Sequence, residues 1–197
     1  MLNRLEDGSI IPAKIPPDRP FVGGEETSLS GVAILEYWQW AYSGIVGNTD
    51  RGNLAEFLVA KALDIPVDVR NDWDDFDLIT ESGITIEVKS SSYVQSWKQK
   101  KVYTPRFSVK RTLPTWDYSS TTKQRYADIY VFCLLAHVDK ETINPMDVSQ
   151  WEFYALRTDA IDRDLGDAKT ISLKDVHSRS KLYRYSELKQ AIRELTY

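Results

Sequence analysis

The sequence predicts a mixed α/β or α+β fold, and three stretches of the chain carry that prediction. Residues 75–91 (DFDLITESGITIEVKSS) alternate apolar and polar side chains around a Ser-Gly turn, which is typical of a β-hairpin. Residues 128–138 (DIYVFCLLAHV) contain a continuous apolar run of the kind found in buried strands. Residues 51–63 (RGNLAEFLVAKAL) repeat apolar side chains at helical spacing instead. Strands and helices are therefore mixed along one chain.

The N-terminal part of the chain is predicted to be an arm followed by a helix. Residues 11–28 hold four prolines and a Gly-Gly pair, which predicts an extended arm rather than a helix or a strand. A helix capped by Ser28 or Ser30 is expected to follow and to end at Gly44. Its many aromatic side chains indicate a place in the core.

A second helix is expected to begin after Thr49 or Asp50, since each is a good N-cap. It runs through residues 51–63 and includes Glu56. Its apolar face carries Leu54, Leu58 and Ala62.

The remaining elements follow in order along the chain. We expect a strand at 67–70, the hairpin at 75–91, a short helix at 92–100, strands at 128–138 and 151–158, and a helix at 186–195 capped by Ser186. One domain over residues 1–197, with residues 1–28 as its N-terminal arm, is the expected organisation for a chain of this length.

The hairpin places two carboxylates against each other. A turn centred on Ser82 puts Asp77 opposite Glu87 and Asp75 opposite Lys89 on one face of the strands. The opposite face is almost wholly apolar and pairs Phe76 with Val88, Leu78 with Ile86, and Thr80 with Ile84. Like charges directly across a sheet destabilise it, and a divalent cation would compensate them. The alternative is a solvated face with an ion pair between Asp75 and Lys89 and no bound metal.

This order of elements resembles the PD-(D/E)XK nuclease superfamily. The resemblance rests on a helix bearing Glu56, a strand with Asp77, a second strand with Glu87-Val88-Lys89, and then a helix with Gln95. It covers residues 50–100, or up to 135 if the apolar strand is included. Phe76 stands where the motif has proline, a position that the superfamily keeps only loosely.

The resemblance implies a restriction-endonuclease-like fold, with a central mixed sheet flanked by helices, and a set of roles. Glu56, Asp77, Glu87 and the Val88 carbonyl would bind Mg²⁺, or Mn²⁺ as a substitute, while Lys89 helps to activate the attacking water. Gln95 matches a functional glutamine of some members. Two of these residues have plainer interpretations: Glu56 as a solvated helix residue paired with Lys61 or Arg51, and Gln95 as a surface amide.

A basic, aromatic segment follows the proposed site. No aspartate or glutamate occurs between Ser90 and Trp116. The candidate nucleic-acid-binding residues in this segment are Lys98, Lys100, Lys101, Arg106, Lys110 and Arg111. The aromatic residues between them are Tyr93, Trp97, Tyr103, Phe107 and Trp116, which offer stacking surfaces. The alternative is a solvated basic loop whose aromatic side chains are partly core.

Composition limits the remaining function classes. The chain has 197 residues, a formal net charge of −4, one cysteine and two histidines, so a disulfide within the chain is excluded and a zinc cluster is not indicated. No run of 18 apolar residues and no apolar signal region occurs, so we expect no membrane partner and a cytoplasmic location. No phosphate-loop, dinucleotide-binding or hydrolase-elbow motif is present.

The sequence therefore predicts a metal-dependent endonuclease that hydrolyses phosphodiester bonds, with DNA as the expected substrate. Double-strand cleavage would favour a homodimer, because one site handles one strand at a time. Two alternatives remain: a catalytically inactive nuclease-fold module that binds nucleic acid, and a structural or interaction protein. RNA is not distinguished from DNA at this stage.

Overall fold

The structure, a computed structural model, describes residues 3–4, 10–11, 13–24, 26–70, 74–117 and 119–196, with backbone only for residues before 13. Contacts within the chain group these residues into two compact units. One unit is formed by residues 1–44 with 67–70, and the other by residues 45–66 with 71–197. Each unit is described by itself, and the single-domain organisation stays a prediction.

The smaller unit contains two short strands and one helix. β1 (Asn3–Arg4) pairs antiparallel with β2 (Ile10–Ile11). The helix α1 (Ile34–Tyr42) begins later than expected, because successive backbone turns occupy residues 26–32. No residue of α1 is buried, so the prediction that its aromatic side chains lie in a core is wrong.

The strand expected at residues 67–70 is also absent. Lys14 donates to the Val67 carbonyl at 2.6 Å and forms an ion pair with Asp68 at 3.6 Å. These side-chain contacts hold the segment within the smaller unit without a strand partner.

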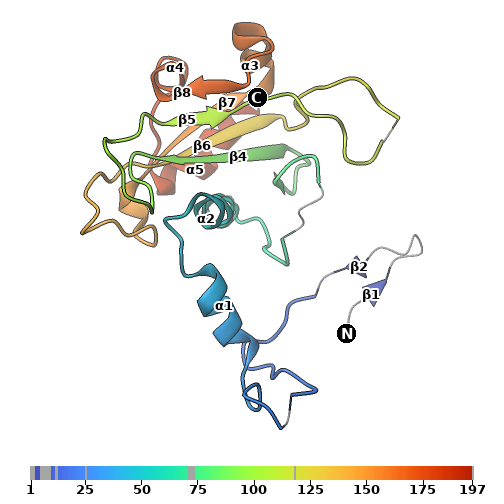
Figure 1. Ribbon diagram of the computed structural model, residues 1–197. Helices are drawn as coiled ribbons and strands as arrows, with labels where there is room; N and C mark the ends of the chain where they lie inside the picture. The colour runs from blue at the N-terminus through green and yellow to red at the C-terminus, as the bar shows by residue number, and fades with distance from the viewer. Residues whose placement is uncertain are drawn as a thin grey trace. The chain divides into compact units, whose positions relative to one another are not determined.

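The larger unit is built on a four-stranded mixed sheet (Figure 1). Its strands are β3 (Leu78–Ile79), β4 (Thr85–Ser92), β6 (Ile129–Leu135) and β7 (Trp151–Arg157), in the order β3-β4-β6-β7. β4 and β6 run parallel, whereas the two outer pairs are antiparallel. The predicted apolar strands at 128–138 and 151–158 are confirmed with shorter bounds, and so is the mixed α/β class.

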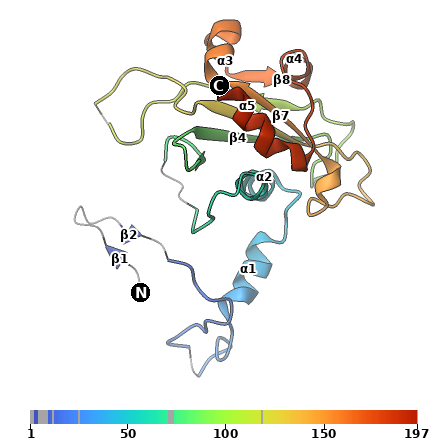
Figure 2. The same ribbon diagram turned by 180° about the vertical axis from the view of Figure 1, so that it is seen from behind.

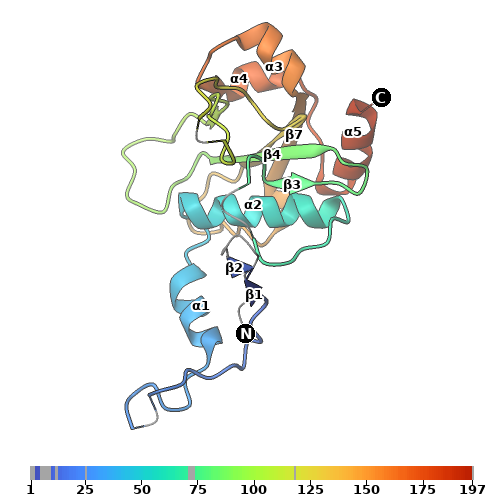
Figure 3. The same cartoon turned by 90° about the vertical axis from the view of Figure 1, so that its right-hand side faces the viewer.

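Two helices cover one face of this sheet. α2 (Asn48–Ala62) runs beside β3 and β4, and α5 (Leu188–Leu195) packs against β7 (Figures 2 and 3). The core between them and the sheet includes Val59, Ile86, Val131, Phe153 and Ile192. α2 confirms the second predicted helix, although Gly47 caps it. α5 confirms the last predicted helix, but Ser186 lies in the preceding 3₁₀ turn, η2 (Tyr185–Glu187), and does not cap it.

The other face is covered by smaller elements that the sequence did not predict. They are β5 (Arg106–Ser108), α3 (Thr158–Leu165), β8 (Thr170–Ser172) and α4 (Leu173–His177), and a 3₁₀ turn, η1 (Val148–Gln150), precedes β7. β5 and β8 form an antiparallel pair. Their buried side chains pack on the apolar residues of β6 and β7 that point away from α2. The sheet is therefore flanked on both faces, as predicted.

The helix expected at residues 92–100 is wrong. Within this segment side chains take the hydrogen bonds that a helix would give to its backbone. The Gln99 side chain accepts from the Gln95 N–H at 2.7 Å and donates to the Tyr93 carbonyl at 3.2 Å, and the Ser92 hydroxyl accepts from the Val94 N–H. Such side-chain bonds compete with helical pairing and favour an irregular loop.

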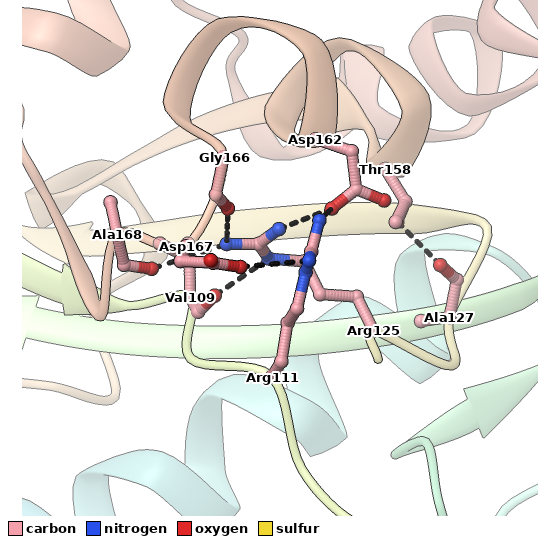
Figure 4. A network of polar contacts seen from close by, with 9 residues as sticks. All are labelled: Val109, Arg111, Arg125, Ala127, Thr158, Asp162, Gly166, Asp167 and Ala168. Carbon is pink, nitrogen blue, oxygen red and sulfur yellow. Dashed lines mark hydrogen bonds and ion pairs between the residues drawn. The ribbon is translucent and has the colours of Figure 1, made fainter. Parts of the chain in front are cut away.

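A buried guanidinium ties the loop before β6 to α3 (Figure 4). Arg125 donates to the Val109, Gly166 and Ala168 carbonyls and forms an ion pair with Asp162, while its side chain is fully buried. Arg111 adds ion pairs to Asp162 and Asp167, each at 2.8 Å. This network fixes the backbone next to Tyr126.

Among the helices that the structure describes, none is long and apolar enough to cross a lipid bilayer.

Candidate active site

The predicted hairpin register is confirmed where the two strands pair. Leu78 lies opposite Ile86 and Ile79 opposite Thr85, the register expected for a turn centred on Ser82. Ile86 and Val88 are buried against α2, so the apolar face also lies where the alternation placed it. The regular ladder ends at Leu78, however, and the acidic residues lie beyond it.

Asp77 sits beside β4 just where this pairing ends. Its backbone N–H donates to the Ile86 carbonyl at 3.0 Å, and its carboxylate accepts the Val88 N–H at 2.7 Å. The side chain therefore supplies an acceptor that the shortened β3 no longer offers to β4. This contact places one Asp77 oxygen next to the middle residue of the Glu-Val-Lys tripeptide.

Glu87 and Lys89 form an ion pair on the same strand, with side chains 19% and 27% exposed. Burial raises the pKa of the Glu87 carboxyl above its ordinary value. Lys89 opposes that shift, whereas the charge of Asp77 and, more weakly, that of Glu56 add to it. The structure thus brings Glu56, Asp77, Glu87 and Lys89 into one electrostatic group.

Asp75 does not pair with Lys89, in contrast to the predicted register. Asp75 instead accepts the Thr115 N–H at 2.8 Å, because the hairpin ladder has ended before this residue. The alternative of a cross-strand ion pair between Asp75 and Lys89 is therefore not what the structure shows.

Arg51 is the residue whose position the sequence gave least reason to notice. It lies in the first half of α2, is 3% exposed, and donates to the Ser90 hydroxyl at 3.0 Å, the Val46 carbonyl and the Asn48 side chain. Burial lowers the pKa of its guanidinium. Its contact with Ser90 joins the helix that carries Glu56 to the strand that carries Glu87 and Lys89. A buried arginine is rare enough that only the structure could reveal this link.

Gln95 lies beyond the end of β4 and is 5% exposed. Its side-chain nitrogen donates to the Ser92 carbonyl at 3.1 Å, while its Oε1 accepts no hydrogen bond from the residues that the structure describes. The plain interpretation of Gln95 as a surface amide is wrong, because the side chain is buried. No contact joins it directly to Glu87 or Lys89 within the described chain.

The acidic residues have the ligand type that a magnesium ion prefers, but they do not form a preformed binding site. Within the described ranges, no three His, Cys, Asp or Glu side chains are arranged to hold a metal. Asp77 is held by Val88, and Glu87 by Lys89. Mg²⁺ nevertheless commonly uses only one or two carboxylates, with waters and substrate phosphates completing its shell. Asp77 and Glu87 satisfy that smaller requirement.

The basic segment is divided by the structure. Lys98, Lys100, Lys101, Arg106 and Lys110 are exposed. Arg106 also donates to the Thr170 hydroxyl at 2.8 Å. Arg111 differs from them, because its charge is matched by Asp162 and Asp167. A role for these residues in binding nucleic acid stays a prediction.

One comparison with known proteins assigns the chain to a family. A family model described as bacteriophage T4 endonuclease IV matches residues 37–175, which is more than two thirds of the chain and includes every candidate site residue named above. The chain belongs to the bacteriophage T4 endonuclease IV family. A comparison with curated proteins gives no match. Membership of an endonuclease family confirms the prediction of a nuclease family, and it leaves the PD-(D/E)XK assignment a prediction.

In this member of the endonuclease IV family, the matched region spans both sides of the candidate site. It contains α2 with Arg51 and Glu56, the hairpin with Asp77, and the strand with Glu87 and Lys89. The part of the chain that family membership concerns is thus the part in which the structure brings these residues together.

Proposed function

We propose that the chain is a metal-dependent endonuclease that hydrolyses phosphodiester bonds in DNA with a PD-(D/E)XK-type site. Family membership supports the nuclease class. The observation that carries the site is the grouping of Asp77, Glu87 and Lys89 at the point where β3 ends beside β4. A central mixed sheet flanked by helices is compatible with a restriction-endonuclease-like arrangement.

Asp77, Glu87 and the Val88 carbonyl would hold Mg²⁺ or Mn²⁺, with Glu56 contributing through its charge. When bound, the ion would neutralise charge on the phosphate and lower the pKa of a water molecule. The backbone N–H and C=O of one strand residue point the same way, so the Val88 carbonyl faces the side from which Asp77 approaches.

Lys89 has two roles in this proposal. Its ammonium now neutralises Glu87, and it would turn to the negative charge that develops on the phosphate once Glu87 engages a cation. Arg51 would keep α2 in register with β4 through Ser90. Gln95 stays a candidate functional glutamine by its place after the Glu-Val-Lys strand, and its buried Oε1 has an unused acceptor within the described chain.

The exposed lysines that follow β4 would contact the DNA backbone. Lys98, Lys100 and Lys101 lie in an irregular loop within a segment that lacks acidic residues. Such side chains provide binding that weakens with salt and carries little sequence information. Cleavage of both strands of a duplex would need two copies of the site, and a homodimer would supply them.

Cleavage of labelled single- and double-stranded DNA in Mg²⁺ tests this proposal. We expect Asp77→Asn and Lys89→Met to lose cleavage, while Glu141→Gln, an exposed carboxylate elsewhere, cleaves like the wild type. Binding of DNA without cleavage by the wild type would favour an inactive nuclease-fold module instead. Full activity in Asp77→Asn or in Lys89→Met would remove that residue from the mechanism.

A further inference from the structure

A hollow lies next to the candidate site and is lined by aromatic and acidic side chains. It has a volume of about 380 Å³, within the range of pockets that take small organic groups, and it is lined by Asp74, Asp75, Phe76, Thr115, Trp116 and Tyr126. Phe76 is the residue directly before Asp77, so the hollow and the site share one stretch of backbone.

The Trp116 ring is held out in solvent. It is 74% exposed, although an indole is among the side chains that gain most from burial. Phe76 and Tyr126 are partly buried beside it. Within the described part of the chain, none of these three rings stacks on another aromatic ring, whereas Phe107 and Phe132 lie 5.1 Å apart in the core. Aromatic carbon therefore makes up part of the wall of the hollow.

The loop that carries Trp116 is fixed at its base and again at Thr115. Thr112 and Gln124 exchange backbone hydrogen bonds at 2.9 and 3.0 Å, which closes the loop. The Thr115 N–H donates to Asp75 Oδ1, which ties the loop to the hairpin segment. On the other side, the buried Arg125 network anchors the backbone beside Tyr126 (Figure 4). The backbone on both sides of the hollow is thus anchored by the fold.

The charge of the hollow selects against phosphate. Asp74 and Asp75 line it. Burial raises the pKa of the Tyr126 hydroxyl, and the negative charges of Asp75 and Asp117 raise it further. Asp75 Oδ1 is used by Thr115, and within the described chain Oδ2 accepts no hydrogen bond. A ligand for this place is therefore planar, carries no negative charge and is able to donate a hydrogen bond.

We propose that Phe76, Trp116, Tyr126 and Asp75 form a subsite for one unpaired nucleobase of the substrate. Nucleobases stack on aromatic side chains whatever their identity. Every base also presents an N–H donor on its Watson–Crick edge, and that donor reaches Asp75 only when the base is unpaired. The subsite rests on the proposed function, because it would take a base of the DNA strand that the candidate site cleaves.

The test measures binding without metal, so that cleavage does not enter. The full chain in a chelator is titrated against three labelled 12-nucleotide ligands: a single strand, the same strand with its central bases removed, and the duplex. The variants are Trp116→Ala and Trp116→Phe. Trp40→Ala is the matched control, since Trp40 is 83% exposed but lies outside this region of the chain.

We expect Trp116→Ala to bind the intact single strand about fivefold more weakly or worse, the lower bound for loss of a base-stacking residue. Its affinity for the abasic strand and for the duplex should equal that of the wild type. Trp116→Phe should restore most of the loss, and Trp40→Ala should show none. Equal losses on the intact and abasic strands, or no loss on either, would overturn the subsite.

Two further outcomes distinguish a failure of the subsite from a failure of the proposed nuclease function. If Trp116→Ala weakens binding of the intact strand alone, but the wild type never cleaves DNA in Mg²⁺, the subsite is supported and the proposed nuclease is contradicted. Aromatic rings beside carboxylates also suit an organic cation. Arginine amide is titrated against the wild type and Trp116→Ala in the same way. If it binds the wild type more tightly than Trp116→Ala, while the two bind the single strand equally, the nucleobase proposal is overturned and the hollow is a cation site.

Discussion

The Asp77 carboxylate accepts the Val88 N–H at 2.7 Å, so the candidate catalytic aspartate also completes the hairpin. Asparagine keeps an acceptor oxygen at this position, and alanine does not. We expect Asp77→Asn to lose cleavage with little change in the free energy of unfolding. Asp77→Ala should lose cleavage and also about 1–2 kcal/mol of stability. Urea unfolding of both variants measures the difference, and equal stabilities would mean that the bond to Val88 contributes nothing.

Arg51 is expected to matter for both stability and activity. Arg51→Met leaves the Val46 carbonyl, the Asn48 side chain and the Ser90 hydroxyl without their common donor. We expect a loss of about 2–4 kcal/mol, because three hydrogen bonds from one charged donor are lost together. Ser90→Ala removes only one of these bonds and should cost about 1 kcal/mol. A Ser90→Ala loss as large as that of Arg51→Met would contradict this account of the contacts.

The exposed lysines of the loop after β4 should set the salt dependence of DNA binding. Changing Lys100 and Lys101 together to Gln should reduce the slope of log K against log salt by about 1.4 for single strands. Lys174, an exposed lysine on α4, is the control and should leave the slope unchanged when it is replaced by Gln. An unchanged slope in the double variant would place the phosphate contacts elsewhere on the chain.

Asp162 should give the protein a component of acid sensitivity. Burial alone would raise the pKa of this carboxyl, but hydrogen bonds and charges from Arg111 and Arg125 outweigh it and lower the pKa below its ordinary value. The ion pairs therefore stabilise the fold above the unfolded pKa of about 3.9 and lose that effect as pH falls through the lower folded pKa.

The stability gap between wild type and Asp162→Asn should accordingly be largest near neutral pH and shrink in acid. Thermal unfolding at several pH values measures it. Asp167→Asn is the control, because that carboxylate is 88% exposed and, among the described residues, forms its ion pair with Arg111 alone. A gap that widens in acid would contradict the direction of the Asp162 shift.

Local patterns in the sequence were enough to predict the sheet. The hairpin register follows from the alternation around Ser82, and β6 follows from its unbroken apolar run, because both depend on side chains within one short stretch. The elements on the other face of the sheet were not predicted. β5 and β8 have three residues each and are fixed by their mutual pairing and by the core beneath them. No local pattern encodes such long-range pairing.

The candidate site was predictable in part for the same reason. Glu87 and Lys89 share a strand face, so their proximity follows from the strand period. The contact between Arg51 and Ser90 joins residues 39 positions apart and depends on how α2 packs on β4. The expected helix at 92–100 failed because Ser92 and Gln99 hydrogen-bond the backbone, a competition that helical spacing does not reveal.

The most direct test of the proposed nuclease is a titration with Mg²⁺ and Mn²⁺ that follows thermal unfolding and DNA cleavage together, with Glu87→Gln as the control. If Asp77 and Glu87 hold the ion, both metals should raise the melting temperature of the wild type and start cleavage, since a ligand at 100 times its Kd stabilises a protein by about 2.7 kcal/mol. Both effects should vanish in Glu87→Gln. Cleavage that persists in Glu87→Gln, or a wild type that responds to neither metal, would contradict a metal-dependent site at Glu87.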